Sequence, residues 1–89
     1  MRSDIDPKIW GPPAWLFIDS VFKSFPVSAS IQDQKWMVDF LTVLGDALPC
    51  QQCRFNYKLF SVMNPPSVAG RVQVEAWMDA YKKWSAARR

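Results

Sequence analysis

Two cysteines carry the most distinctive chemistry in this sequence. Cys50 and Cys53 lie three positions apart in the stretch LPCQQCR, directly after Pro49, and the chain has no other cysteine. At the start of a helix, the first sulfur of such a pair lies beside free N–H groups and the positive end of the helix dipole, which favour the thiolate that attacks disulfides. The second sulfur, one turn later, is close enough to form a disulfide with the first. The motif therefore predicts a redox pair with Cys50 as the more accessible sulfur.

Other interpretations of the cysteine pair are weaker. A zinc site needs about four protein ligands, whereas this chain offers two thiols and no histidine, so we expect no metal. A thioredoxin-type protein would place strands and a βαβ pattern around the motif, and the sequence shows neither. The absence of histidine also excludes a Cys–His nucleophile pair. A redox disulfide in a helical protein and an inert pair both remain open on these grounds.

The elements that must position the cysteines are predicted to be helices. Apolar residues recur at spacings of three and four in four segments that prolines separate. The first segment follows Pro12 and Pro13, the third begins at the cysteines, and Ser28 or Ser30 and Ser67 are candidate helix caps. The sequence therefore predicts an all-α, four-helix bundle with the Cys-x-x-Cys motif at the start of the third helix, in a single domain spanning residues 1–89. Its predicted core consists of Trp15, Phe22, Phe40, Leu44, Phe60, Trp77 and Tyr81.

Composition and charge narrow the classes of function. No apolar run approaches the ~20 residues that span a bilayer, and the N-terminus has no apolar segment typical of a secretory signal. We therefore expect neither a membrane span nor a signal peptide. The sequence does not determine the compartment, and the cytoplasm is one candidate. The net charge is +3, with Lys82, Lys83, Arg88 and Arg89 near the end of the chain. We interpret these cations as a solvated helix end rather than a nucleic-acid-binding tail.

Four segments together carry a resemblance to a known family. They are WGPPAW at residues 10–15, the pair Phe25-Pro26, LPCQQCR at residues 48–54, and Arg71 followed six residues later by Trp77. In this order and spacing they resemble the Erv/ALR family of FAD-linked sulfhydryl oxidases, particularly its short single-domain viral forms. The resemblance covers nearly the whole chain.

The resemblance implies a set of roles. The family fold is a four-helix bundle that holds FAD beside the disulfide. Cys53 would be the flavin-proximal sulfur, Cys50 would exchange with a substrate dithiol, and Trp15 would lie in the flavin-contacting part of the first helix. Family members commonly dimerise through their first two helices, so the resemblance also implies a homodimer that acts on protein thiols.

Three positions that should contact the cofactor depart from the family pattern. Asp19 stands where the family has a flavin-binding histidine. Lys82 and Lys83 stand where it has the His-Asn pair of a His-Asn-x-Val-Asn run. Lysine and aspartate cannot stack on adenine, and a carboxylate adds negative charge near a dinucleotide that already has two phosphates. The sequence therefore predicts weakened or lost FAD binding.

Three hypotheses about function follow. The chain is a sulfhydryl oxidase if flavin is bound, with protein thiols as its substrates. Alternatively, it is an FAD-free structural or partner-binding component of a larger assembly such as a virion. The third hypothesis is a flavin-free carrier that passes its disulfide to a partner by exchange.

Overall fold

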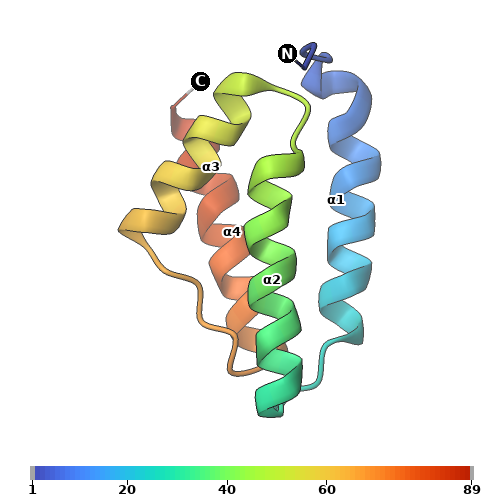
Figure 1. Cartoon of the computed structure of the whole chain (residues 1–89), viewed down its shortest axis with the longest axis vertical. Coiled ribbons are helices and arrows are strands. Elements are labelled where there is room, and N and C mark those ends of the chain that lie inside the picture. Colours follow the sequence, from blue (N-terminus) through green and yellow to red (C-terminus); the bar gives the residue numbers. More distant parts are fainter. Residues whose placement is uncertain (1, 89) are drawn as a thin grey trace.

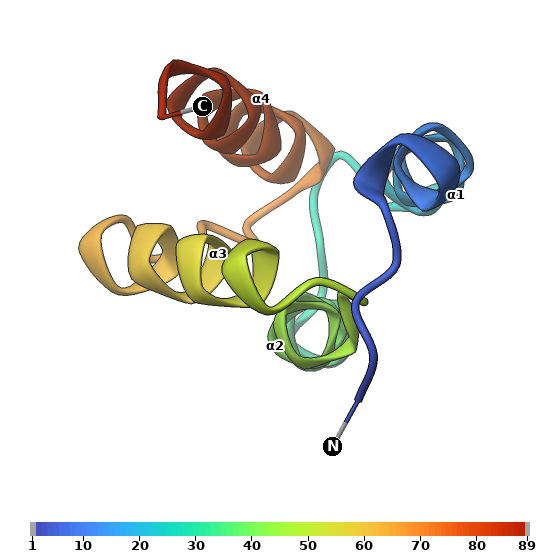
Figure 2. The ribbon, with the colours of Figure 1, turned by 90° about the horizontal axis from the view of Figure 1, so that it is seen from above.

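The computed structural model describes residues 2–88 and contains helices but no strand in that range. The helices are α1 (Pro7–Ser24), α2 (Ile31–Ala47), α3 (Gln51–Met63) and α4 (Arg71–Ala87). Figure 1 shows α1, α2 and α4 along the long axis, with α3 slanting away from the top of α2. Seen from above, α1 and α4 form one side of the bundle and α2 and α3 the other (Figure 2). The predicted all-α, four-helix fold is confirmed, with the cysteine motif at the start of the third helix. Arg89 lies outside the described residues.

The first helix begins earlier than the proline pair suggested. Asp6 is its N-cap, and one Asp6 carboxylate oxygen accepts a hydrogen bond from the backbone N–H of Lys8 at 3.0 Å. Pro7 occupies the first turn, where a missing N–H does no harm. Pro12 and Pro13 therefore lie inside α1 rather than at its start, and they cannot donate to the carbonyls one turn earlier.

The helix caps were predicted correctly for α2 and incorrectly for α4. The Ser30 hydroxyl accepts from the Asp33 N–H at 3.1 Å, and the Asp33 carboxylate accepts from the Ser30 N–H at 3.3 Å. This reciprocal pair is a capping box, and hydrogen bonding from Ser30 lowers the pKa of Asp33. Ser67 does not cap α4. Its N-cap is Gly70, which has no side chain to accept a hydrogen bond.

Side chains from all four helices meet in one core. Phe22, Phe60, Trp77 and Tyr81 are buried as predicted, whereas Trp15, Phe40 and Leu44 are only half-buried and pack against the edge of the core. The core also contains residues that the predicted list omits, four of which, Phe25, Met37, Val74 and Met78, are fully buried. The core cluster consists of Ile18, Phe22, Phe25, Met37, Leu41, Tyr57, Phe60, Val74, Trp77, Met78 and Tyr81.

Helices α2 and α3 approach closely at a glycine. A Cβ atom on Gly45 would lie 2.8 Å from the Tyr57 ring, so no larger residue fits without moving that ring. The Tyr57 hydroxyl donates a hydrogen bond to the Leu41 carbonyl at 2.7 Å. The glycine is needed here for space, and the contact sets how α3 leaves α2.

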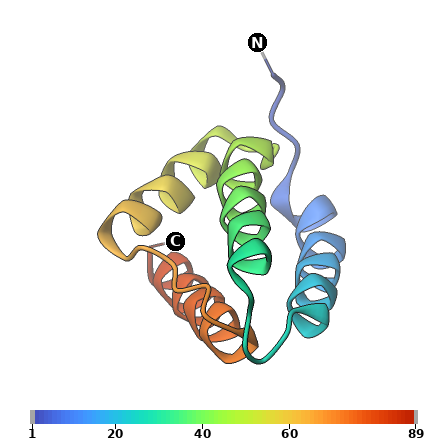
Figure 3. The same ribbon diagram turned by 60° about the horizontal axis from the view of Figure 1, so that its bottom comes forward.

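At the opposite end of the bundle, the α1–α2 and α3–α4 connections lie against each other (Figure 3). The Ala29 N–H donates to the Ala69 carbonyl, and the Arg71 N–H donates to the Pro26 carbonyl, both at 3.0 Å. A Cβ atom on Gly70 would lie 1.8 Å from the Val27 carbonyl oxygen. These backbone contacts hold the start of α4 next to the end of α1.

Burial at Phe22 predicts a large effect on stability. Its side chain is 1% exposed, so Phe22→Ala should lower the free energy of unfolding by about 3–5 kcal/mol, because it leaves a cavity as well as removing buried apolar surface. Phe40→Ala should lower it less, because Phe40 is half-buried. Phe55→Ala is the control, since Phe55 is 57% exposed. Urea denaturation measures all three, and equal losses for Phe22→Ala and Phe55→Ala would contradict the packing described.

Candidate redox site at the start of α3

The two cysteines form a disulfide at the N-terminus of α3. Their Cα atoms are 5.1 Å apart. Cys50 is the N-cap residue in an extended conformation, and its sulfur accepts a hydrogen bond from the Cys53 N–H at 3.1 Å. The predicted position of the pair at a helix start is therefore confirmed. A sulfur in the N-cap position is where a thiolate gains most from the helix dipole.

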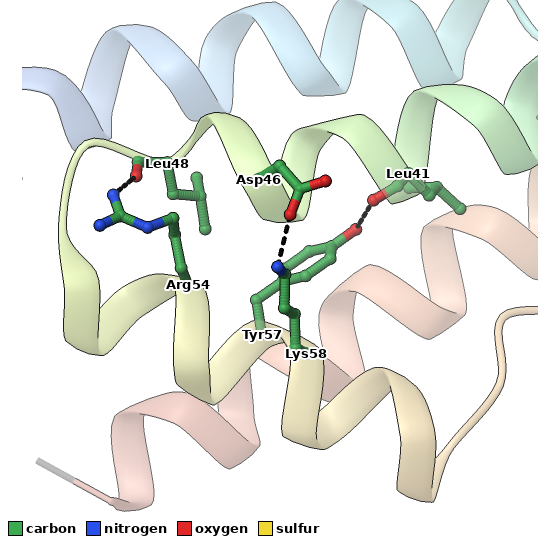
Figure 4. A network of polar contacts seen from close by, with 6 residues as sticks. All are labelled: Leu41, Asp46, Leu48, Arg54, Tyr57 and Lys58. Atoms are coloured by element: carbon green, nitrogen blue, oxygen red, sulfur yellow. Dashed lines mark hydrogen bonds and ion pairs between the residues drawn. The ribbon is translucent and has the colours of Figure 1, made fainter. Parts of the chain in front are cut away.

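A short turn between α2 and α3 holds Cys50 in place. Leu48 ends α2, and its carbonyl accepts the Cys50 N–H at 2.9 Å. The same carbonyl accepts a second hydrogen bond, from the Arg54 guanidinium at 2.6 Å (Figure 4). Arg54 also starts the α3 ladder, because its N–H donates to the Cys50 carbonyl at 2.9 Å. One arginine thus connects both ends of the turn that carries the reactive pair.

Cys50 is not the more accessible of the two cysteines. It is 9% exposed, whereas Cys53 is half-buried, so the expectation from sequence is wrong for this conformation. The segment before α1 folds back on the motif and flanks Cys50 on both sides. The Asp4 carboxylate accepts the Gln51 N–H at 3.0 Å, and the Ile5 N–H donates to the Pro49 carbonyl at 2.8 Å.

Two other polar contacts lie along the α2–α3 interface (Figure 4). Lys58 forms an ion pair with Asp46, and this cation holds the pKa of Asp46 below its usual value. Burial raises the pKa of the Tyr57 hydroxyl, with a smaller contribution from Tyr81. Tyr57 therefore stays protonated at neutral pH and acts as a hydrogen-bond donor to Leu41 rather than as a base.

Three of the four residues predicted to contact a cofactor meet between α1 and α4. The Lys82 ammonium lies 4.4 Å from the centre of the Trp15 ring, and 3.8 Å from a carboxylate oxygen of Asp19. The Trp15 ring lies 6.4 Å from that of Tyr81. Lys83 is exposed, and within residues 2–88 it forms no ion pair or cation–π contact with this group.

Two hollows in the surface lie away from the cysteines, one between α2 and α3 and one between α1 and α4. A groove of about 380 Å³ runs between α2 and α3, where Leu41, Gly45 and Tyr57 form part of its wall. A second hollow of about 230 Å³ lies between α1 and α4, and its wall includes three carboxylates, those of Asp19, Glu75 and Asp79. Neither lining includes Cys50 or Cys53.

Sequence reasoning missed the segment before α1. Asp4 and Gln51 are 47 positions apart, and nothing in their types or spacing signals that one accepts a hydrogen bond from the other. The one local signal is the Asp-Pro sequence at residues 6–7, which indicates that a helix begins there. The start of that helix limits the direction in which the preceding residues can run.

Within residues 2–88, no group of three or more Cys, Asp or Glu side chains is arranged to hold a metal ion. No helix in that range combines the length and the apolar character needed to cross a bilayer.

Comparison with known proteins finds relatives of one kind. No family model matches the chain. Over 74 residues, 82% of the chain, it is 28% identical to the mitochondrial FAD-linked sulfhydryl oxidase ERV1 of Saccharomyces cerevisiae. Over 68 residues, 76% of the chain, it is 22% identical to the FAD-linked sulfhydryl oxidase ERV1 of Arabidopsis thaliana. The chain spans 39% and 36% of the lengths of these two curated relatives.

Solved structures give the same result for the fold. The FAD-binding domain of Erv1 from Saccharomyces cerevisiae superposes with a TM-score of 0.88 at 24% identity, covering 94% of this chain and 80% of that one. The yeast Erv1 core superposes with a TM-score of 0.87 at 23% identity, covering 97% and 73%. These similarities confirm the resemblance to the Erv/ALR family and the Erv1-like fold.

The role of Arg54 in the turn gives a testable prediction. Arg54→Ala should lower the free energy of unfolding by about 1–3 kcal/mol, because it removes a charged donor from the half-buried Leu48 carbonyl. Lys58→Ala is the matched control, since it removes one cation from the same helix. The Lys58–Asp46 pair is exposed, so its loss should change stability much less. A larger loss for Lys58→Ala than for Arg54→Ala, measured by thermal denaturation, would argue against this assignment.

Proposed function

We propose that this chain, an Erv1-like sulfhydryl oxidase fold with a Cys50–Cys53 disulfide, exchanges that disulfide with dithiols of partner proteins. The observation that carries the proposal is the position of the pair: Cys50 caps α3, and the Cys53 N–H donates a hydrogen bond to its sulfur. A helix N-terminus stabilises the thiolate that is released when a disulfide is attacked.

The exchange proceeds in two steps. A partner thiolate attacks the Cys50 sulfur, a mixed disulfide forms, and Cys53 leaves as a thiolate. The second partner thiol then attacks the partner's own sulfur and releases Cys50, whose thiolate is stabilised by the Cys53 N–H. The partner becomes a disulfide, and the two cysteines of this chain take up two electrons and two protons. A second turnover requires reoxidation by another disulfide, from a protein or a small molecule such as glutathione disulfide.

FAD is the cofactor to test, because the two curated relatives are named FAD-linked. The residues between α1 and α4 do not suit it. Lys82 lies over the Trp15 ring and pairs with Asp19, so the aromatic face that a cofactor ring would stack on already has a cation against it. The adjoining hollow has three carboxylates in its wall, which would repel two phosphates. We therefore infer that FAD binding is weakened or lost.

This proposal predicts a colourless protein that exchanges once. Purified with FAD in excess and then desalted, the chain should retain much less than one flavin per chain. It should oxidise about one equivalent of dithiothreitol per chain and then stop. The control, Cys50→Ala with Cys53→Ala, should oxidise none. Flavin absorbance near one per chain, or continuing peroxide production that depends on Cys53, would restore the oxidase hypothesis.

A second candidate function, partner binding, has its own observation. Ile9, Leu16 and Phe17 on α1 and Val43 on α2 are all large apolar residues that are more than half exposed. Surfaces of this kind commonly mark protein interfaces. We propose that α1 and α2 carry a homodimer contact, and that the same face would serve a structural role in a larger assembly such as a virion.

Light scattering tests the homodimer. Leu16 is 72% exposed, so Leu16→Glu should leave the fold intact while raising the dimer dissociation constant about tenfold or more, because each ~1.4 kcal/mol of lost apolar contact is tenfold. Val72→Glu makes the same kind of change on α4, where Val72 is 64% exposed, and should leave the dimer unchanged. A monomeric wild-type protein at high concentration would count against this surface as an interface between copies.

A further inference from the structure

The segment of residues 2–6, called here the N-terminal arm, makes a specific contact with the redox turn. In Figure 2 the arm passes beside the connection from α2 to α3. Two hydrogen bonds hold it there, from the Gln51 N–H to the Asp4 carboxylate at 3.0 Å and from the Ile5 N–H to the Pro49 carbonyl at 2.8 Å. The Trp10 indole N–H donates to the Ile5 carbonyl at 2.8 Å and ties the arm back to α1. The contacts fall on the residues directly before and after Cys50.

The Asp4 carboxylate binds the same helix N-terminus as the Cys50 sulfur. The first N–H groups of a helix have no partner within the helix. In α3 the Cys53 N–H points to the Cys50 sulfur, and the Gln51 N–H points to the Asp4 carboxylate. A carboxylate and a Cys50 thiolate thus share one helix N-terminus. Two negative charges so close disfavour each other, particularly where one of them is buried.

We propose that the N-terminal arm is a cover on the redox turn, and that the Asp4 carboxylate disfavours the Cys50 thiolate by placing a second negative charge at the same helix N-terminus. This inference rests on the proposed exchange reaction and adds a positioning residue to it. A partner dithiol reaches Cys50 only when the arm moves away, because Cys50 is buried while the arm is in place. Movement of Asp4 away from the turn then removes the competing negative charge at the moment when the sulfur becomes accessible.

The other charged side chains near the turn are engaged with other groups, not with the first N–H groups of α3. The Arg54 guanidinium is directed at the Leu48 carbonyl. Asp46, at the end of α2, is neutralised by Lys58 and, to a smaller extent, by Arg2 on the arm. At the end of α4, Arg88 lies over the Trp84 ring. Among these groups, Asp4 is the one that hydrogen-bonds a free N–H of the first turn of α3.

The test compares two variants that each remove one carboxylate charge. Asp4→Asn keeps the size of the side chain and an oxygen acceptor, so it leaves the arm contact possible while removing the charge. Asp39→Asn removes the same charge from an exposed position on α2. In reduced full-length protein, the rate of iodoacetamide labelling is followed from pH 5 to pH 9, and peptide mass spectrometry assigns it to Cys50 or Cys53.

We expect faster labelling at Cys50 only, and only in Asp4→Asn. At pH 6, Asp4→Asn should label Cys50 about threefold to tenfold faster than wild type, with its pH profile displaced to lower pH, because the thiolate forms more readily. Asp39→Asn should match wild type. In glutathione buffers at pH 8, the Asp4→Asn disulfide should be reduced more readily by a similar factor. High salt should shrink the difference, since it screens the charge.

Specific outcomes would overturn the inference. Equal Cys50 labelling in Asp4→Asn and Asp39→Asn would do so, and so would an equal rise at Cys50 and Cys53, which indicates a general loosening of the fold. Neither measurement needs a partner protein. If wild-type protein fails to oxidise dithiothreitol while Asp4→Asn still accelerates labelling of Cys50, the proposed exchange fails and the role of Asp4 stands.

Discussion

The contact of Tyr57 with Gly45 is the constraint from which the arrangement of α3 follows. The ring occupies the space where any larger residue at position 45 would have its Cβ atom, and its hydroxyl is bound by the Leu41 carbonyl. The same ring packs edge-on against Trp77 and Tyr81 of α4. One side chain therefore sets the crossing of α3 with α2 and its distance from α4. The N-terminus of α3, where the cysteines lie, is placed as a consequence.

The chemistry of the site follows from how that helix N-terminus is used. Two of its free backbone N–H groups have acceptors from outside the helix ladder. The Cys53 N–H donates to the Cys50 sulfur, and the Gln51 N–H donates to the Asp4 carboxylate. Arg54 adds a fixed positive charge but directs it at a backbone carbonyl, where it stabilises the turn. The reactivity of Cys50 is therefore a balance between a helix dipole that favours the thiolate and an acidic side chain that opposes it.

On the α1–α4 side of the molecule, an Erv1-like fold carries a compact group of aromatic and charged side chains. The Trp15 and Tyr81 rings lie 6.4 Å apart, Asp19 pairs with Lys82, and the Lys82 ammonium lies over the Trp15 ring. A cation and an anion that pair across two helices stabilise the bundle without needing a bound molecule. An Erv1-like fold is compatible with polar contacts of this kind, because the buried core and the exposed polar groups lie on different sides of the same helices.

By itself, the sequence determined the four helices, a serine cap for the second helix, part of the core and the position of the cysteine pair at a helix start. These depend on apolar periodicity, on proline and on contacts between residues a few positions apart, all of which are visible along the chain. Tertiary structure alone decided the burial of Cys50, the contact of Asp4 with Gln51, and the meeting of Lys82 with Asp19 and Trp15. Each of these joins segments that are distant in sequence. Such contacts depend on where the helices cross, and the spacing of residues along the chain does not reveal those crossings.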